Sequence, residues 1–111
     1  MSNFEDLRLI DLIKKFQRTA EGIYSSRSLS LLKEAGRQLQ DVYNFFVTAE
    51  GAYEEQQGQF KNLFTSFNYA AVIVNNAVKN GGLSSDDNEL LNECLQIMLK
   101  CCQTIINLLE G

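Results

Sequence analysis

The side chains of this chain that could carry out acid–base or metal chemistry are carboxylates, because the sequence contains no histidine. Without histidine, neither a nucleophilic triad nor the Glu-x-x-His pairs of a helical di-iron site can form. A helical pyrophosphohydrolase would need Glu-Glu-x-x-Glu and a second Glu-x-x-Asp, whereas residues 54–58 read Glu-Glu-Gln-Gln-Gly and no Glu-x-x-Asp occurs. We therefore expect no catalytic residue, no metal site and no cofactor, and we predict that the protein is not an enzyme.

The three cysteines, Cys94, Cys101 and Cys102, fall on one predicted helix, where neighbouring positions have poor geometry for a disulfide. Zinc and redox sites need CxxC spacing or histidine partners. We expect reduced thiols that pack in the core as small apolar groups. The N-terminus lacks the pattern of a signal peptide, and no apolar run reaches the roughly 18 residues of a membrane span. The sequence thus favours a cytoplasmic protein with no membrane partner.

The charge pattern argues against nucleic acid as a partner, because the sequence pI is about 4.7 and no basic stripe is interleaved with aromatics. One local basic patch is a candidate site for an anionic ligand or an acidic partner surface. Its alternative interpretation is the solvated outer face of the first helix. The patch consists of Arg8, Lys14, Lys15 and Arg18.

Aromatic residues are concentrated in the middle of the chain, where eight of the eleven fall within residues 43–69. Such a cluster is typical of a core with a dimer interface. The alternative is an aromatic patch or cavity that receives a partner helix or a flat ligand, because aromatic side chains dominate binding energy at interfaces. We predict a partner or dimer interface made of Tyr43, Phe46, Tyr53, Gln56, Phe60, Phe64 and Phe67.

Most of these interface residues belong to a longer pattern, a seam of residues spaced alternately four and three apart between positions 32 and 77. A repeat of 3.5 residues keeps one helical surface facing a partner. Gln56 is its one polar member, and a lone buried polar group can fix the register of two helices. The seam consists of Leu32, Ala35, Leu39, Val42, Phe46, Ala49, Tyr53, Gln56, Phe60, Leu63, Phe67, Ala70, Val74 and Ala77.

Two further helices flank the seam. Ser2 followed by Glu5 fits a capping box, which predicts a first helix over about 3–25. At the other end, Asn80-Gly81-Gly82 is a stop signal and Ser84 or Ser85 can cap the next helix, which predicts a last helix over about 85–109.

The seam crosses residues 49–60 without a break in register, and these residues include no proline and no Asn-Gly pair. We therefore predict a continuous central helix over about 28–80, with each flanking helix folded back along one half of it. Two such chains would form a dimer with a four-helix cross-section. The alternative is a turn near 51–58, which gives a monomeric four-helix bundle related to the dimer by domain swapping. In both cases residues 1–111 form a single all-α domain.

These features favour a non-catalytic protein-interaction module, such as an adaptor, an inhibitor or a chaperone-like homodimer. The alternative is a helical protein that sequesters a small ligand between protomers, using aromatics from 43–67 with Arg18, Lys33 or Arg37. A third interpretation is that the chain resembles, in helical content, the small paired-helix proteins exported by type VII secretion. It departs from their Trp-x-Gly turn, because it contains no tryptophan.

Overall fold

Four helices follow one another along the chain in the computed structural model, which describes residues 3–26, 28 and 30–111. No strand occurs in these ranges, so the predicted all-α class is confirmed. The molecule is elongated, with extents of 48 × 22 × 19 Å. The helices are α1 (Phe4–Ser26), α2 (Leu31–Ala49), α3 (Glu54–Lys79) and α4 (Ser85–Glu110).

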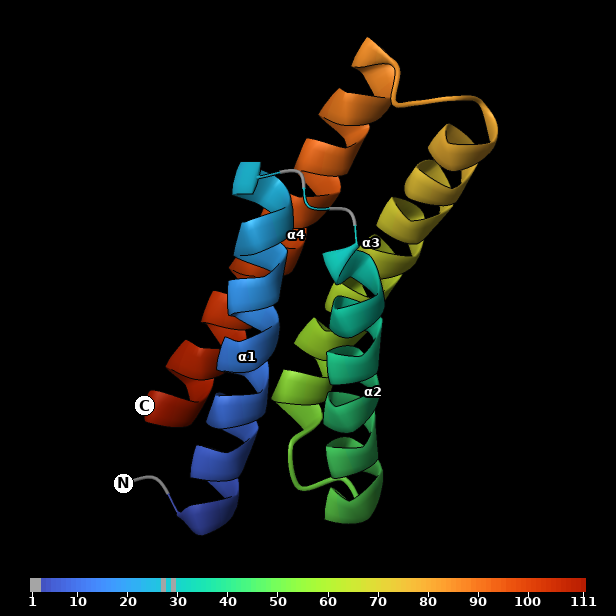
Figure 1. Cartoon of the computed structure of the whole chain (residues 1–111). Coiled ribbons are helices and arrows are strands. Elements are labelled where there is room, and N and C mark those ends of the chain that lie inside the picture. Colours follow the sequence, from blue (N-terminus) through green and yellow to red (C-terminus); the bar gives the residue numbers. More distant parts are fainter. Residues whose placement is uncertain (1–2, 27, 29) are drawn as a thin grey trace.

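The helices alternate in direction, so that each runs antiparallel to the next (Figure 1). Short connections bring successive helices back beside each other, as in an up-and-down bundle. The α3–α4 pair packs most extensively, and α1 packs equally against α2 and α4. The α2–α3 pair makes the fewest close approaches. The bundle is therefore tight on three sides and loose on the fourth.

The ends of α1 and α4 agree with the predicted helices to within a residue. Ser84 caps α4 as predicted, because its hydroxyl accepts a hydrogen bond from the backbone N–H of Asp87 at 3.1 Å. Gly81 has a φ of 87°, the left-handed conformation that glycine adopts without steric cost. The predicted cap Ser2 lies outside the described residues. At the start of α1 the carboxamide oxygen of Asn3 accepts from the backbone N–H of Asp6 at 2.8 Å.

In this structure the continuous central helix predicted over about 28–80 does not form, and the alternative with a turn near 51–58 describes the chain. Helix α2 ends at Ala49, and the chain reverses through Glu50 and Gly51, whose φ angles are 50° and 81°. The register gave no sign of this turn because Tyr53, the last residue before α3, keeps its seam position and is only 8% exposed. Two antiparallel helices can both face the core without any change in the phase of their apolar residues.

The seam does form the buried face of α2 and α3, because each of its members is buried or half-buried. Helix α4 has a wide apolar stripe, and it carries many of the most deeply buried side chains. Close packing around these buried side chains holds the neighbouring helices in place. The fully buried residues of α4 are Leu91, Leu95, Met98, Cys102 and Ile105.

Candidate functional site

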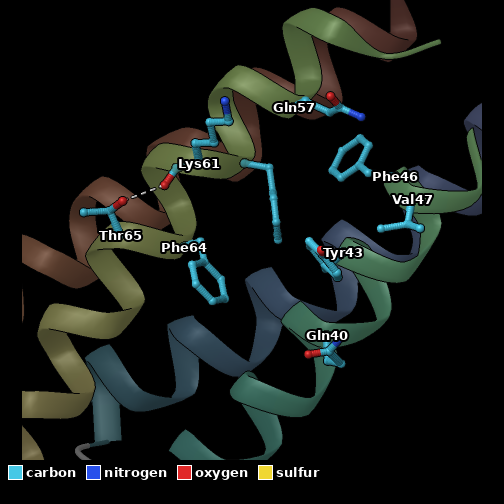
Figure 2. Close-up of a pocket in the computed structure, with 9 residues that line it drawn as sticks. Gln40, Tyr43, Phe46, Val47, Gln57, Lys61, Phe64 and Thr65 are labelled. Atoms are coloured by element: carbon cyan, nitrogen blue, oxygen red, sulfur yellow. Dashed lines mark hydrogen bonds between the residues drawn. The ribbon is translucent and has the colours of Figure 1, made fainter. Parts of the chain in front are cut away.

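An open groove of about 550 Å³ lies between α2 and α3, on the loose side of the bundle. We call it the α2–α3 groove, and Figure 2 shows the side chains that line it from both helices. Aromatic and aliphatic groups make up most of its lining. The lining residues are Gln40, Tyr43, Phe46, Val47, Gln57, Phe60, Lys61, Phe64 and Thr65.

The floor of the groove consists of two buried rings, Phe46 from α2 and Phe60 from α3. Their centroids are 5.4 Å apart, within the range of favourable aromatic pairs. Phe64 extends this contact along α3, with its centroid 6.0 Å from that of Phe60. The rings thus join the two helices at the base of the groove and leave the space above them open.

The walls of the groove expose large apolar side chains to solvent. Tyr43 is 51% exposed, Val47 57% and Phe64 43%. Tyr43 and Val47 are four residues apart on α2 and therefore lie on one face of it, opposite Phe64 on α3 (Figure 2). An apolar surface that is gathered in a concave site, rather than scattered singly, is characteristic of a binding site.

One contact lies at each end of the groove: α2 touches α3 at one end, and the turn between them is tied to α1 at the other. At one end the ring of Phe67 lies against Gly36, where an added Cβ would stand only 3.3 Å from the ring. At the other end the hydroxyl of Tyr53 donates a hydrogen bond of 2.6 Å to the Asp6 carboxylate of α1. Burial, together with this hydrogen bond, raises the pKa of Tyr53 to about 12. The groove is therefore a built feature between two anchored ends.

Among the described residues, Lys61 is the only charged one that lines the groove, and no described carboxylate belongs to the lining. Within the part of the chain that the structure describes, the ion pairs are Lys15–Asp11 and Arg37–Glu34, so the ammonium of Lys61 is not neutralised by a neighbour. The hydroxyl of Thr65 donates to the Lys61 carbonyl at 2.9 Å and is thereby satisfied within α3. A single positive charge thus borders an otherwise uncharged aromatic surface.

Four of the seven predicted interface residues, Tyr43, Phe46, Phe60 and Phe64, come together in the groove. The other three, Tyr53, Gln56 and Phe67, lie outside its lining. Tyr53 packs against Phe45 beyond the floor, with ring centroids 5.5 Å apart, and Gln56 is half-buried. Sequence reasoning missed several lining residues. The signal for Val47 was its position four residues after Tyr43, outside the seam, whereas the polar residues Gln40, Gln57, Lys61 and Thr65 gave none.

The predicted basic patch on α1 does not form one site. Arg8 lies 6.0 Å from the centroid of the Phe45 ring and borders a second, more polar cavity of about 560 Å³ that also contains carboxylates. Lys15 pairs with Asp11 at 3.2 Å, on the same face of α1 as Arg8. Lys14 and Arg18 are exposed on a different face. The four cations are thus divided between two surfaces.

Of the basic residues predicted for a small ligand, Arg18 is exposed on α1 and does not line the groove. Lys33 and Arg37 lie on the exposed surface of α2, where Arg37 is paired with Glu34. Neither Lys33 nor Arg37 lines the groove.

The cysteines are free thiols, as predicted, and Cys101 and Cys102 are buried. Burial raises the pKa of all three thiols, and that of Cys102 to about 12. Across residues 3–26, 28 and 30–111, no three His, Cys, Asp or Glu side chains are grouped closely enough to hold a metal ion.

Comparisons with models of protein families, with curated proteins and with solved structures found no match to this chain. Its function must therefore be argued from the geometry of the site. None of the helices in the described part of the chain is both long enough and apolar enough to cross a membrane.

Proposed function

We propose that this chain is a non-catalytic protein-interaction module that binds a helix of another protein in the α2–α3 groove. The observation that supports the proposal is the pairing of exposed apolar walls, at Tyr43, Val47 and Phe64, with a buried aromatic floor. Aromatic groups at the centre of a desolvated pocket are the usual anchors of protein interfaces. A bound partner would cover the apolar surface that the bundle leaves open.

The shape of the groove favours a helix as the occupant. Its walls are two antiparallel helices, and the lining residues extend over about two turns of each wall, from Gln40 to Val47 on α2 and from Gln57 to Thr65 on α3. An amphipathic helix places apolar side chains at positions i, i+3, i+4 and i+7 along one face, which is the spacing that such a groove can receive. The partner would complete the packing that α2 and α3 do not make with each other.

The charge of the groove favours a partner helix with acidic residues beside its apolar face. Lys61 is the one charged group of the lining and has no acidic neighbour there. A carboxylate of the partner next to this ammonium would orient the helix, and it would contribute more to specificity and association rate than to affinity. A partner with a basic flank would place like charges together.

Selection of helical peptides tests the proposal without a known partner. A displayed library of peptides of about 16 residues, varied at the apolar and flanking positions of a helix, is selected on the wild-type protein and counter-selected on Phe64→Glu. We expect enrichment of apolar i, i+3, i+4 and i+7 positions with acidic flanks, and at least about tenfold weaker binding to Phe64→Glu. Tyr69→Glu is the matched control, because Tyr69 is 65% exposed on α3 but does not line the groove.

The control variant should bind the selected peptides as the wild type does. The proposal is contradicted by a selection that enriches no sequence, and equally by peptides that bind Phe64→Glu as tightly as Tyr69→Glu.

A second candidate function is the binding of a small apolar anion, favoured by the volume of about 550 Å³ and by Lys61 at the edge of the groove. The probe is dodecanoate, whose binding would raise the melting temperature by mass action. A rise in wild type that is lost in both Lys61→Gln and Phe64→Ala supports this candidate. No rise at millimolar dodecanoate contradicts it.

We also propose that the protein self-associates as a homodimer. The seam, which is buried within the bundle, keeps its 3.5-residue period from α2 into α3, so the same face would pack against the helices of a second chain if the turn between them opened. A dimer would present two α2–α3 grooves and could hold two partner helices at once. Light scattering over a hundredfold range of concentration should give a mass near twice the 12.6 kDa of the chain, and a constant mass of one chain would contradict the dimer.

A further inference from the structure

The turn between α2 and α3 holds the chain in an unfavourable conformation. Glu50 has a φ of 50° and is the only residue other than glycine with a positive φ in the described ranges. The left-handed conformation brings the Cβ of an L-residue close to the next carbonyl oxygen, which is why glycine or asparagine usually occupies it. Tyr53, at the start of α3, provides no side-chain cap. A straight helix through this segment would relieve the strain at Glu50.

Opening this turn would break few contacts between α2 and α3, the two helices that it joins. The α2–α3 pair makes the fewest close approaches in the bundle, whereas α1 packs well on α2 and α3 packs well on α4. The molecule is thus built from two hairpins, α1–α2 and α3–α4. If the turn straightens, both hairpins stay intact, and the contacts between them can re-form with the hairpins of a second chain.

The seam shows that the same residues would stay buried after such a change. Ala49, Tyr53, Gln56 and Phe60 continue the heptad phase of α2 into α3. A continuous helix from about 31 to 79 would therefore present one unbroken apolar face.

We infer that a second copy of this chain is bound by exchange of the α3–α4 hairpin, with residues 50–53 straightening into that continuous helix. The inference rests on the self-association proposed above and assigns its mechanism.

The exchange predicts how the dimer responds to salt. The two straightened segments would cross near residues 50–53, where Glu50, Glu54 and Glu55 are exposed on each chain. The crossing would bring the carboxylates of both copies together, and salt screens such repulsion. Raising NaCl from about 20 mM to about 300 mM should therefore raise the dimerisation constant, and a constant that falls with salt contradicts the crossing.

Three glycine variants test the straightening itself. Gly51→Ala should raise the dimerisation constant at least about tenfold, because alanine is strained at the φ of 81° and favoured in a helix. Glu50→Gly should lower it about tenfold, because glycine relieves the turn and weakens the helix. Gly58→Ala is the matched control: Gly58 lies within α3 in both forms and has no neighbour within 4 Å of an added Cβ. The dimerisation constant of Gly58→Ala should stay within about twofold of the wild-type value.

The constants are measured by light scattering after each variant is refolded at high and at low concentration, with circular dichroism to check helical content. The exchange is overturned if Gly51→Ala stays monomeric at every concentration while keeping its helical content. It is also overturned if Glu50→Gly and Gly51→Ala dimerise alike.

An isotope-filtered NOE experiment separates hairpin exchange from simple docking of two intact bundles. Phe67 of α3 lies against Gly36 of α2, so protons of this pair are in contact. In a dimer refolded from ¹³C-labelled and unlabelled chains, exchange places this contact between chains. A dimer in which the Gly36–Phe67 NOE remains within one chain contradicts the exchange.

These outcomes are distinct from those of the peptide selection. A monomeric Gly51→Ala that still binds the selected peptides removes the exchange and leaves the interaction function standing. A swapped dimer that binds none of the selected peptides leaves the exchange standing and removes the interaction function.

Discussion

The α3–α4 side and the α2–α3 side of this bundle use similar helices in opposite ways. On the α3–α4 side, Leu95 and Met98 of α4 and Leu63 of α3 are almost completely buried. On the α2–α3 side, Tyr43 and Phe64 remain about half exposed above a buried aromatic floor. The same chain therefore closes one pair of helices fully and leaves another pair open. The difference indicates that the stability of the fold comes from the closed side, while the open side is available for binding.

The turns that follow α2 and α3 differ in the same way. The α3–α4 turn contains Gly81 in the left-handed region and a side-chain cap from Ser84. The α2–α3 turn also has a left-handed glycine, Gly51, but it places Glu50 in the left-handed region as well and has no side-chain cap at Tyr53. Local sequence thus favours the turn on the closed side, and it only tolerates the turn on the open side.

The largest expected effect contrasts buried and groove side chains. Leu95→Ala should lower the free energy of unfolding by about 3 kcal/mol, because Leu95 is fully buried on the closed side. Phe64→Ala should lower it by less than about 1 kcal/mol, because Phe64 is 43% exposed. Urea unfolding measures both. Equal decreases in the free energy of unfolding would mean that Phe64 stabilises the fold as much as Leu95 does, and the two sides would not differ in the way proposed.

Loss of the hydrogen bond from Tyr53 to Asp6 has the next largest expected effect. Tyr53→Phe should lower the free energy of unfolding by about 1 kcal/mol near neutral pH. The tyrosine hydroxyl also makes the stability of the wild type depend on pH. Burial raises the pKa of Tyr53 to about 12 in the folded state, above the ordinary tyrosine pKa of 10.0. The contribution of Tyr53 to the free energy of unfolding is therefore fully present below pH 10.0 and is lost as the pH rises towards 12. Between about pH 9 and 11 the wild type should lose more stability than Tyr53→Phe. Tyr69→Phe, on the exposed surface of α3, should track the wild type, and a Tyr53→Phe profile parallel to wild type would refute the linkage.

The two turns can be compared at equivalent positions, since Glu50 is the C-cap of α2 and Asn80 that of α3. Glu50→Gly should raise the free energy of unfolding of the monomer by about 1 kcal/mol, because it removes left-handed strain. Asn80→Gly should give no gain, because Asn80 has a φ of −99°. The unfolding curves are recorded at a concentration where each variant is monomeric. A gain at Asn80 that matched the gain at Glu50 would show that strain does not distinguish the turns.

The smallest effect concerns helix glycines. Gly58→Ala should raise the free energy of unfolding by somewhat less than about 1 kcal/mol, the difference in helix propensity, because its Cβ meets open space. Gly36→Ala should gain less or lose, because its Cβ would press on the ring of Phe67. Chemical unfolding of both variants checks this. Equal gains would mean that α2 and α3 are not held together at Phe67.

The sequence predicted the parts of the fold that local signals specify. The predictions of helices α1 and α4 were correct, because glycines and apolar periodicity mark them directly, and Ser84, one of the two predicted caps of α4, is its cap. The turn at 50–53 was only the alternative prediction, because Gly51 is its one residue with a strong turn preference and because Tyr53 kept the heptad phase. The outcome was decided by tertiary packing, which can override weak local preference.

The candidate site was predictable only in its aromatic component. Tyr43 and Phe64 stood out as apolar residues outside or beside the seam, and they do line the groove. The contribution of Lys61 was not visible, because a lone lysine on a helix is normally a solvated surface residue. Whether two neighbouring helices pack tightly or diverge depends on contacts such as Gly36 with Phe67, and no pattern within a single helix records them.

The most direct test of the open side as a binding surface is the intermolecular NOE spectrum of the protein with one selected helical peptide. We expect contacts from the apolar side chains of the peptide to the rings of Tyr43 and Phe64, and none to Tyr69. Contacts confined to the surfaces of α1 and α4 would show that the peptide binds elsewhere and would refute the groove as the binding site.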